Sequence, residues 1–339
     1  MFDGLDSLVQ LSLEKNDLKF IPEFCFYGTP NLKYLSLANN KLLTLKSLDL
    51  AGLLVLENLD LTGNNLTFLS ELSLPPFPTL KSADFRENPL DSVFPSTFEI
   101  MNSTTKLYLG GAGANLNLQK NSFMGLRQLE LLELYNVQIA VLERFLLQGM
   151  PALLTLKIRG NITSIDFDAF VDLTNLLDLD LSFSHIRNIS MDAFYGLDSV
   201  GRIDLSDNEL ESLPPGLFGL QQQKNLKEIV LSGNRLTILP TEFFQMLRLP
   251  NRQHQQQLLS IRLDRNPWDC TCSMTTWNPQ LVGRIRETAP RCATPKRLRN
   301  WGVFHALRKG GLQCKSSRKR NLRKFSFRKN HGNSNNIVS

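Results

Sequence analysis

Leucine recurs along most of this chain at a spacing that leaves few folds open. Residues Leu8, Leu11, Leu13, Asn16 and Leu18 spell L-x-x-L-x-L-x-x-N-x-L. The pattern returns every 23 to 26 residues, with one longer final step of 32. Eleven registers begin at Leu8, Leu32, Leu56, Leu80, Thr104, Leu129, Leu153, Leu176, Val200, Leu226 and Leu258. A period of this length indicates a stack of similar structural units.

Each repeat predicts one short strand, because L-x-L places alternate side chains on one face of a strand. A single strand cannot bury its leucines alone, so neighbouring repeats must stack and share a continuous core. We therefore expect an α/β solenoid, curved like a horseshoe, with a concave parallel β-sheet and short helical turns and loops outside. A second series, once per repeat, is expected to form an apolar spine on the convex side: Phe2, Phe26, Leu50, Leu74, Phe98, Phe123, Leu147, Phe170, Phe194, Phe218 and Phe244.

The asparagine at the ninth position of the pattern is expected to turn inward. Its amide offers two donors and an acceptor, which can satisfy backbone groups of neighbouring coils that a buried loop leaves without partners. This asparagine ladder comprises Asn16, Asn40, Asn64, Asn88, Asn161, Asn208, Asn234 and Asn266. Ala112, Val137 and Ser184 replace asparagine in the remaining three coils, which we expect to be looser or locally irregular.

Composition and motifs exclude several classes of function. No run reaches the roughly 20 apolar residues that a membrane helix needs, so we expect no membrane span in this chain. Phosphate-binding, dinucleotide-binding and serine-hydrolase motifs are missing from the sequence, and the four histidines lack the spacing of paired metal ligands. We expect no enzymatic activity, no catalytic residue, no metal and no cofactor.

The repeats end in a distinctive cysteine motif. Asn266-Pro267-Trp268-Asp269-Cys270-Thr271-Cys272 is followed by Cys292 and Cys314. Spacing alone leaves three disulfide connectivities open, and a zinc site is the competing reading of four cysteines. Over residues 2–268 the chain resembles the leucine-rich repeat family, and its N-P-W-x-C-x-C motif resembles the cysteine-rich C-terminal cap of extracellular members of the Slit, Toll, connectin and chondroadherin kind.

The resemblance carries further expectations. It implies first-to-third and second-to-fourth pairing, hence Cys270–Cys292 and Cys272–Cys314. We divide the chain into a repeat solenoid over residues 1–265, a cap over 266–314 and a disordered basic tail over 315–339. Cys25 is left over, either as a buried free thiol or as a link to an N-terminal part that is missing here.

Several features predict an extracellular location. Disulfides form in oxidising compartments. The chain begins within a repeat and shows no signal peptide, which favours a start that lacks both the signal and an N-terminal cap. Glycosylation sequons stand at Asn65, Asn102 and Asn188, which we expect to be exposed. A fourth sequon, at Asn161, is discounted because a ladder residue should be buried.

The concave sheet is the predicted binding surface, since the third, fifth, seventh and eighth residues of each unit face solvent without affecting the core. Large side chains and charges gather on units five to nine, where exposed aromatic residues could anchor a partner. The predicted protein-binding residues are Tyr108, Leu131, Glu133, Tyr135, Lys157, Arg159, Asp178, Asp180, Phe183, Arg202 and Asp204. The alternative is an ordinary solvated sheet with scattered large residues.

We therefore expect an extracellular protein-binding module that acts in cell adhesion, matrix attachment or receptor-type recognition, without binding nucleic acid. The alternatives are an intracellular leucine-rich repeat scaffold or regulatory protein, and a fragment of a Toll-like innate immune receptor.

Charge is divided unevenly along the chain. Residues 1–269 carry 22 basic and 31 acidic side chains, residues 270–314 carry 8 and 1, and residues 315–339 carry 8 and none. Too few apolar residues follow Cys314 for this tail to fold alone. Its cluster Arg318, Lys319, Arg320, Arg323 and Lys324 suggests binding to a sulfated polysaccharide, the alternative being a solvated or juxtamembrane end.

Deletion of residues 315–339 tests the polysaccharide hypothesis. Because the deletion removes eight cations and no anion, the shortened chain should leave a heparin column at a clearly lower salt concentration than the full chain. Elution of both proteins at the same salt concentration would exclude this role of the tail.

Overall fold

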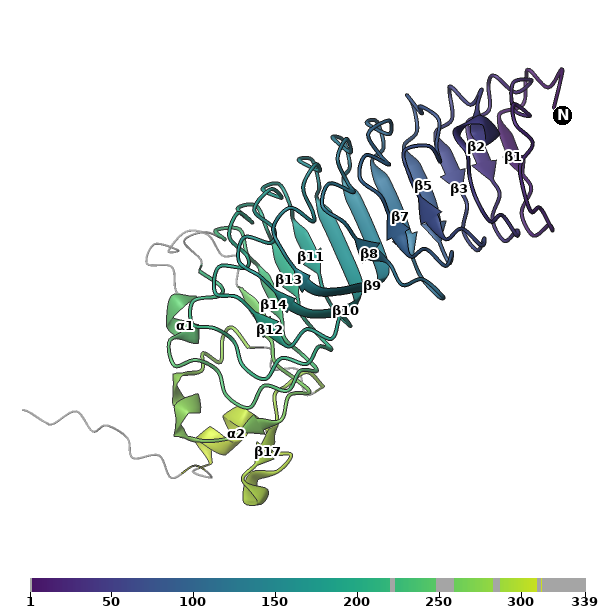
Figure 1. Ribbon diagram of the computed structural model, residues 1–339. Helices are drawn as coiled ribbons and strands as arrows, with labels where there is room; N and C mark the ends of the chain where they lie inside the picture. The colour runs from purple at the N-terminus through teal and green to yellow at the C-terminus, as the bar shows by residue number, and fades with distance from the viewer. Residues whose placement is uncertain (1, 220–222, 248–258, 283–286, 310–311, 313–339) are drawn as a thin grey trace, which may run out of the picture.

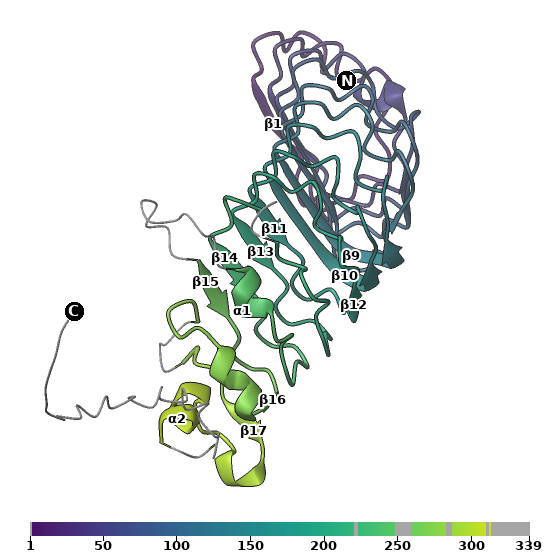
Figure 2. The same ribbon diagram turned by 90° about the vertical axis from the view of Figure 1, so that its left-hand side faces the viewer.

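The computed structural model describes residues 2–219, 223–247, 259–282, 287–309 and 312. Within them the chain winds into a curved, twisted coil, with the N-terminus at one end and the cysteine-rich segment at the other (Figures 1 and 2). One parallel sheet runs along the concave side in the order β1 (Gln10–Ser12), β2 (Tyr34–Ser36), β3 (Asn58–Asp60), β5 (Ser82–Arg86), β7 (Lys106–Gly110), β9 (Leu131–Leu142), β10 (Thr155–Ile165), β11 (Asp178–Asp180), β13 (Arg202–Asp204), β14 (Glu228–Val230) and β15 (Ser260–Arg262).

The register of this sheet follows the repeat. Each of the eleven strands begins two residues after the start of its leucine pattern, and the pairing steps from Leu11 to Leu35 and from Leu35 to Leu59. The predicted solenoid of about eleven coils is therefore confirmed. Its core is continuous, and the spine residues from Phe26 to Phe244 are all buried. Several spine rings stack on their neighbours, as Phe98 and Phe123 do with centroids 6.3 Å apart.

Short elements complete the coils on the other sides. A small parallel sheet joins β4 (Phe68–Leu69), β6 (Ser92–Val93) and β8 (Asn117–Leu118), and β12 (Asn188–Ile189) pairs with β10. Helical turns are η1 (Ser47–Leu50) and α1 (Phe243–Met246). The C-terminal cap contains β16 (Trp268–Asp269), η2 (Cys272–Thr276), β17 (Cys292–Thr294), η3 (Lys296–Leu298) and α2 (Val303–Arg308).

The asparagine ladder forms as predicted in six coils. Asn64 shows the arrangement: its Nδ2 donates to the carbonyls of Leu37 and Leu61, and its Oδ1 accepts from the amide of Leu42. One side chain thus serves backbone groups of two successive coils. Asn16 is exposed instead and donates only to carbonyls of its own coil.

The structure corrects the predicted ladder at Asn161, which is exposed rather than buried. The repeat that contains it has only 23 residues, one fewer than its neighbour. The missing residue falls where the pairing of β9 and β10 shifts, between Ile158 and Gly160, so that Gly160 lies opposite Val137 at the ladder position. A side chain at Gly160 would collide with the backbone of Val137, which explains why glycine stands there.

Two of the three coils without asparagine are locally irregular, as predicted. Strand β7 ends at Gly110 and is followed by a turn at Ala112 and Gly113. Fully buried Val137 lies in β9, which pairs with β10 on both sides of a register shift between Ile158 and Gly160. There the backbone groups pair directly between coils, so no amide is needed. At Ser184 the hydroxyl donates to the carbonyl of Ile158 and takes over part of the asparagine's role.

The cap closes the C-terminal end of the core. Trp268 is fully buried, donates from Nε1 to the carbonyl of Leu263 and packs edge-on against Trp277. The predicted Cys270–Cys292 disulfide is confirmed, with Cα atoms 5.5 Å apart. Cys272 is also disulfide-bonded, but its predicted partner Cys314 lies outside the described residues, as does the basic tail, so both of those expectations stay predictions.

Cys25 is a buried free thiol, as one of its two interpretations expected. Burial raises the pKa of this thiol to about 11, so it stays protonated at neutral pH. Among the described residues, no helix is long and apolar enough to cross a lipid bilayer.

The ladder predicts a difference between two asparagine substitutions. Asn64→Ala leaves two carbonyls and one amide without this partner in a buried site, and should lower the free energy of unfolding by about 1–3 kcal/mol or more. Asn16→Ala, at an exposed ladder position, should change it by no more than about 0.5 kcal/mol. Urea denaturation of both variants without reductant measures the difference, and equal losses would contradict a special role of the buried amide.

Candidate functional site

The structure brings the predicted binding residues together on five neighbouring strands of the concave sheet. They extend from β7 to β13, with Phe183 three residues beyond the end of β11. Parallel pairing aligns their positions in rows across the strands. One row runs through Tyr108, Glu133, Lys157, Asp180 and Asp204, each opposite the next. Residues separated by about 24 positions in sequence therefore form one continuous surface.

Each aromatic ring of this surface is associated with a cation. The Lys157 ammonium lies 5.3 Å from the Tyr135 ring centroid, and the Arg159 guanidinium lies 5.2 Å from that of Phe183. The Tyr135 hydroxyl also donates to a carboxylate oxygen of Glu133 at 2.6 Å. Contacts of this kind hold a ring in one orientation and leave part of its face available. Phe183 is the most open of the rings, at 55% exposure.

The ring of Tyr108 is held in the same way by a residue that the sequence-based site did not include. Arg86 stands 4.7 Å from its centroid and is itself fixed by a two-pronged bond to Asp84. Burial, followed by the negative charge of Glu133, raises the pKa of the Tyr108 hydroxyl, which stays protonated. Arg86 and Asp84 occupy outward positions of unit four, directly beside the predicted patch.

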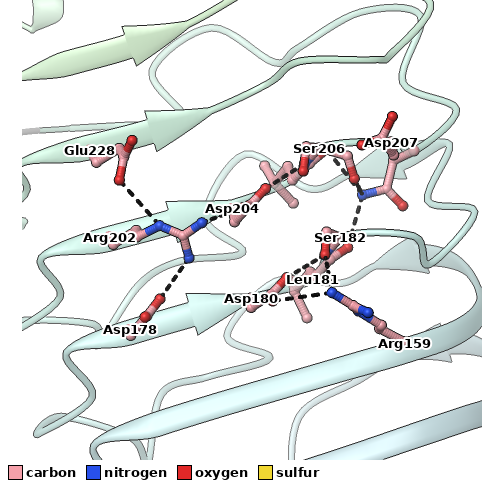
Figure 3. A network of polar contacts seen from close by, with 12 residues as sticks. Arg159, Asp178, Asp180, Leu181, Ser182, Arg202, Asp204, Ser206, Asp207 and Glu228 are labelled. Carbon is pink, nitrogen blue, oxygen red and sulfur yellow. Dashed lines mark hydrogen bonds and ion pairs between the residues drawn. The ribbon is translucent and has the colours of Figure 1, made fainter.

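Arg202 is the centre of a charge network in the C-terminal half of the surface (Figure 3). Its guanidinium contacts Asp178 at 3.1 Å, Glu228 at 3.2 Å and also Asp204. Burial alone would lower the pKa of Arg202, but the bond to Asp178 and the charges of Asp204 and Glu228 raise it above its ordinary value. One cation thus holds three carboxylates, and the network keeps a net negative charge.

Asp204 corrects the expectation that this position faces solvent, because only 7% of the residue is exposed. Its carboxylate contacts Arg202 and accepts from the amide of Ser206 at 2.8 Å. Asp204 therefore holds the Arg202 guanidinium in place but offers a ligand little accessible surface. Glu228, which the predicted site left out, occupies the outward third position of its unit and could have been found from the repeat register.

The remaining cations of the patch are more weakly neutralised than Arg202. Arg159 lies 3.9 Å from Asp180 and 3.5 Å from the hydroxyl of Ser182, and its buried Nε has no hydrogen-bond partner. Lys157 contacts the Tyr135 ring, and no carboxylate of the described residues lies within 4.0 Å of its ammonium. The charged surface therefore has two sectors: available positive charge from Lys157 and Arg159 on β10, and excess negative charge on β11 to β14.

A further ion pair strengthens the rim of the second sector. Arg265 bonds both carboxylate oxygens of Asp207 across the intervening coil, at 2.7 and 3.0 Å. Gly233 lies beneath this pair with φ of 70°, and a Cβ there would meet the Asp207 carboxylate at 2.3 Å. Glycine is thus required both by the backbone conformation and by the space.

A separate polar cluster lies beside the sheet, just beyond the ladder position. Glu209 contacts His185 at 2.9 Å, Arg235 at 2.9 Å and Arg187 at 3.2 Å. The hydrogen bond with His185 and the charges of the two arginines lower the pKa of Glu209. In the described part of the chain, no group of three or more His, Cys, Asp or Glu residues could hold a metal ion.

The chain resembles several known proteins. The leucine rich repeat family matches residues 6–66 and, in overlapping segments, 127–236, which together make up half of the chain. Leucine-rich repeat and fibronectin type-III domain-containing protein 4 of Rattus norvegicus is 28% identical over 156 residues, which are 46% of this chain and 23% of that protein. The NT-3 growth factor receptor of Gallus gallus is 32% identical over 117 residues, which are 34% of this chain and 11% of the receptor.

Among solved structures, the fold is similar to that in the crystal structure of the mouse RP105/MD-1 complex, with a TM-score of 0.68 and 24% identity. That likeness covers 88% of this chain and 54% of the other. The chain spans less than a quarter of the length of these two sequence relatives.

The Arg202 network predicts a stability difference that depends on pH. Arg202→Met leaves three neighbouring carboxylates without their shared cation, so at pH 7 it should destabilise the fold by about 1–3 kcal/mol, between the values of surface and buried ion pairs. At about pH 3 most carboxylates are protonated and no longer repel one another, so the loss should shrink.

Arg86→Met is the matched control, because it removes one ion pair and the contact with the Tyr108 ring instead of three ion pairs, and it should cost about 1 kcal/mol or less at pH 7. Chemical denaturation at both pH values measures these differences. A loss for Arg202→Met that is the same at pH 3 and pH 7 would show that packing of the side chain, rather than charge, accounts for it.

Proposed function

The chain belongs to the leucine-rich repeat family, whose model matches half of its residues, and we propose that it is an extracellular binding module. In this proposal the concave sheet binds a protein partner. The proposed contact surface comprises the predicted residues of units five to nine, with Arg86 and Asp84 added from unit four. Adhesion, matrix attachment and receptor-type recognition are the settings in which such a module would act.

The observation that carries this proposal is the set of oriented aromatic rings on a rigid sheet. Tyr108, Tyr135 and Phe183 each lie within about 5 Å of a cation that restrains them. A ring that is already held in place loses little conformational freedom on binding, so more of its contact energy appears as affinity. Aromatic and arginine side chains are also the residue types that most often dominate protein interfaces.

The charge pattern supports a protein partner with charges of both signs. Positive charge on β10 stands beside negative charge on β11 to β14. A partner with an acidic group over Lys157 and a basic group over the Arg202 network would be oriented by both contacts. Such complementarity contributes to the choice of partner and to the rate of encounter more than to affinity itself.

The comparisons support a ligand-binding role in a general way. A leucine-rich repeat chain of similar fold was solved in complex with MD-1, and one sequence relative is named as a growth factor receptor. The Cys270–Cys292 disulfide supports an oxidising compartment, because structural disulfides rarely persist in the cytosol.

The double substitution Tyr135→Ala with Phe183→Ala tests the surface. The multimerised chain would first be screened against an array of purified ectodomains and secreted proteins, and affinity for each hit would then be measured with both forms. Loss of two anchors should weaken binding by about 2 kcal/mol or more, equivalent to roughly 30-fold.

Phe24→Ala with Tyr27→Ala is the matched control, because it removes the same two residue types from exposed positions beside the buried spine residue Phe26. This control should leave affinity unchanged. If the concave variant keeps full affinity while its fold is intact, the proposed surface is not the binding site.

A further inference from the structure

The seventh coil exposes a side chain that its sequence pattern would place in the core. Because this repeat lacks one residue, Gly160 takes the ladder position opposite Val137, and Asn161 pairs with Gln138. Asn161 is exposed, and its side chain forms none of the hydrogen bonds that engage the amides of the buried ladder residues. Asn161 begins the triplet Asn161-Ile162-Thr163, an acceptor sequence for N-linked glycosylation.

A second sequon of the same chain occupies the same place in its own coil. Asn65 directly follows the ladder residue Asn64, just as Asn161 follows Gly160. In both triplets the middle residue is fully buried, as Leu66 and Ile162 are. Both flanking residues are exposed in both triplets, including Thr67 and Thr163. The two sequons are therefore structurally equivalent, although the repeat pattern alone assigns one to the surface and the other to the core.

The surroundings of Asn161 leave room for a large group. Its partner on the preceding strand, Gln138, is exposed, and the side chain of His185 in the next coil is 64% exposed. Asn161 lies two residues beyond Arg159, where the chain leaves the concave surface. A group attached here would border the proposed binding surface on the side of the Glu209 cluster.

We propose that Asn161 carries an N-linked oligosaccharide, an inference that rests on the extracellular location in the proposed function. In the transfer, the Asn161 Nδ2 forms a bond to C1 of the first sugar of a lipid-linked oligosaccharide diphosphate. The bond from C1 to the diphosphate oxygen breaks, the lipid diphosphate leaves, and the amide nitrogen loses one proton. The folded chain tolerates the product because Nδ2 is not used by the core.

The experiment is expression of the full chain behind a heterologous signal peptide in mammalian cells, followed by enzymatic glycan release in ¹⁸O-water and mass spectrometry of the peptides. Peptides that contain Asn161 should show the conversion to ¹⁸O-labelled aspartate that marks an occupied site. Asn161→Gln and Thr163→Ala should each remove the mass of one glycan from the intact protein, whereas Thr163→Ser, which preserves the sequon, should keep it.

Asn65, Asn102 and Asn188 are internal controls for glycosylation, because all three are exposed sequons that do not depend on the shortened repeat. If Asn65 is occupied and Asn161 is not, the inference on Asn161 is wrong while an extracellular location stands. The inference on Asn161 is also wrong if all four asparagines are unmodified in the secreted chain. Retention of the endogenous protein in the cytosol would contradict the proposed function itself.

Discussion

Hydrogen bonds from an asparagine amide to the backbone of two successive coils are the interaction on which this solenoid depends. Each coil must turn away from the sheet through a buried bend, where the backbone amides and carbonyls have no regular partners. Asn40, Asn64, Asn88, Asn208, Asn234 and Asn266 supply those partners and are nearly inaccessible to solvent. Leucine burial favours stacking of the coils, but the amides determine how closely one bend lies upon the next.

The coils without this asparagine show that the requirement belongs to the backbone rather than to the residue. At Val137 the two neighbouring coils extend their strands through the bend, and β9 and β10 satisfy each other directly. At Ser184 a hydroxyl replaces part of the amide. At Gly110 and Gly111 the strand ends and a turn begins, in which the Glu87 carboxylate accepts from the amide of Ala112. Three different solutions meet one physical demand.

The candidate binding surface follows from the same geometry. Because the strands are parallel and in register, outward side chains separated by one repeat become neighbours, and charges on different coils interact directly. Arg202 uses this arrangement to join carboxylates of three coils, and Arg265 reaches across a whole coil to Asp207. The rings that we propose as anchors are contacted by cations of the neighbouring coil, which orient the rings before a partner binds.

The repeat period by itself determined the fold class, the starting residue of every concave strand, the buried spine and the set of outward positions, because stacking of identical units converts sequence spacing directly into spatial neighbours. The resemblance of the cysteine motif added the Cys270–Cys292 pairing. Only the tertiary structure decided which outward side chains pair, since the choice of Arg202 among several carboxylates depends on rotamers and distances. It also showed that Asp204 is buried beside Arg202. Exposure of Asn161 likewise required the structure, because the effect of one missing residue depends on where the pairing with the neighbouring strand changes register.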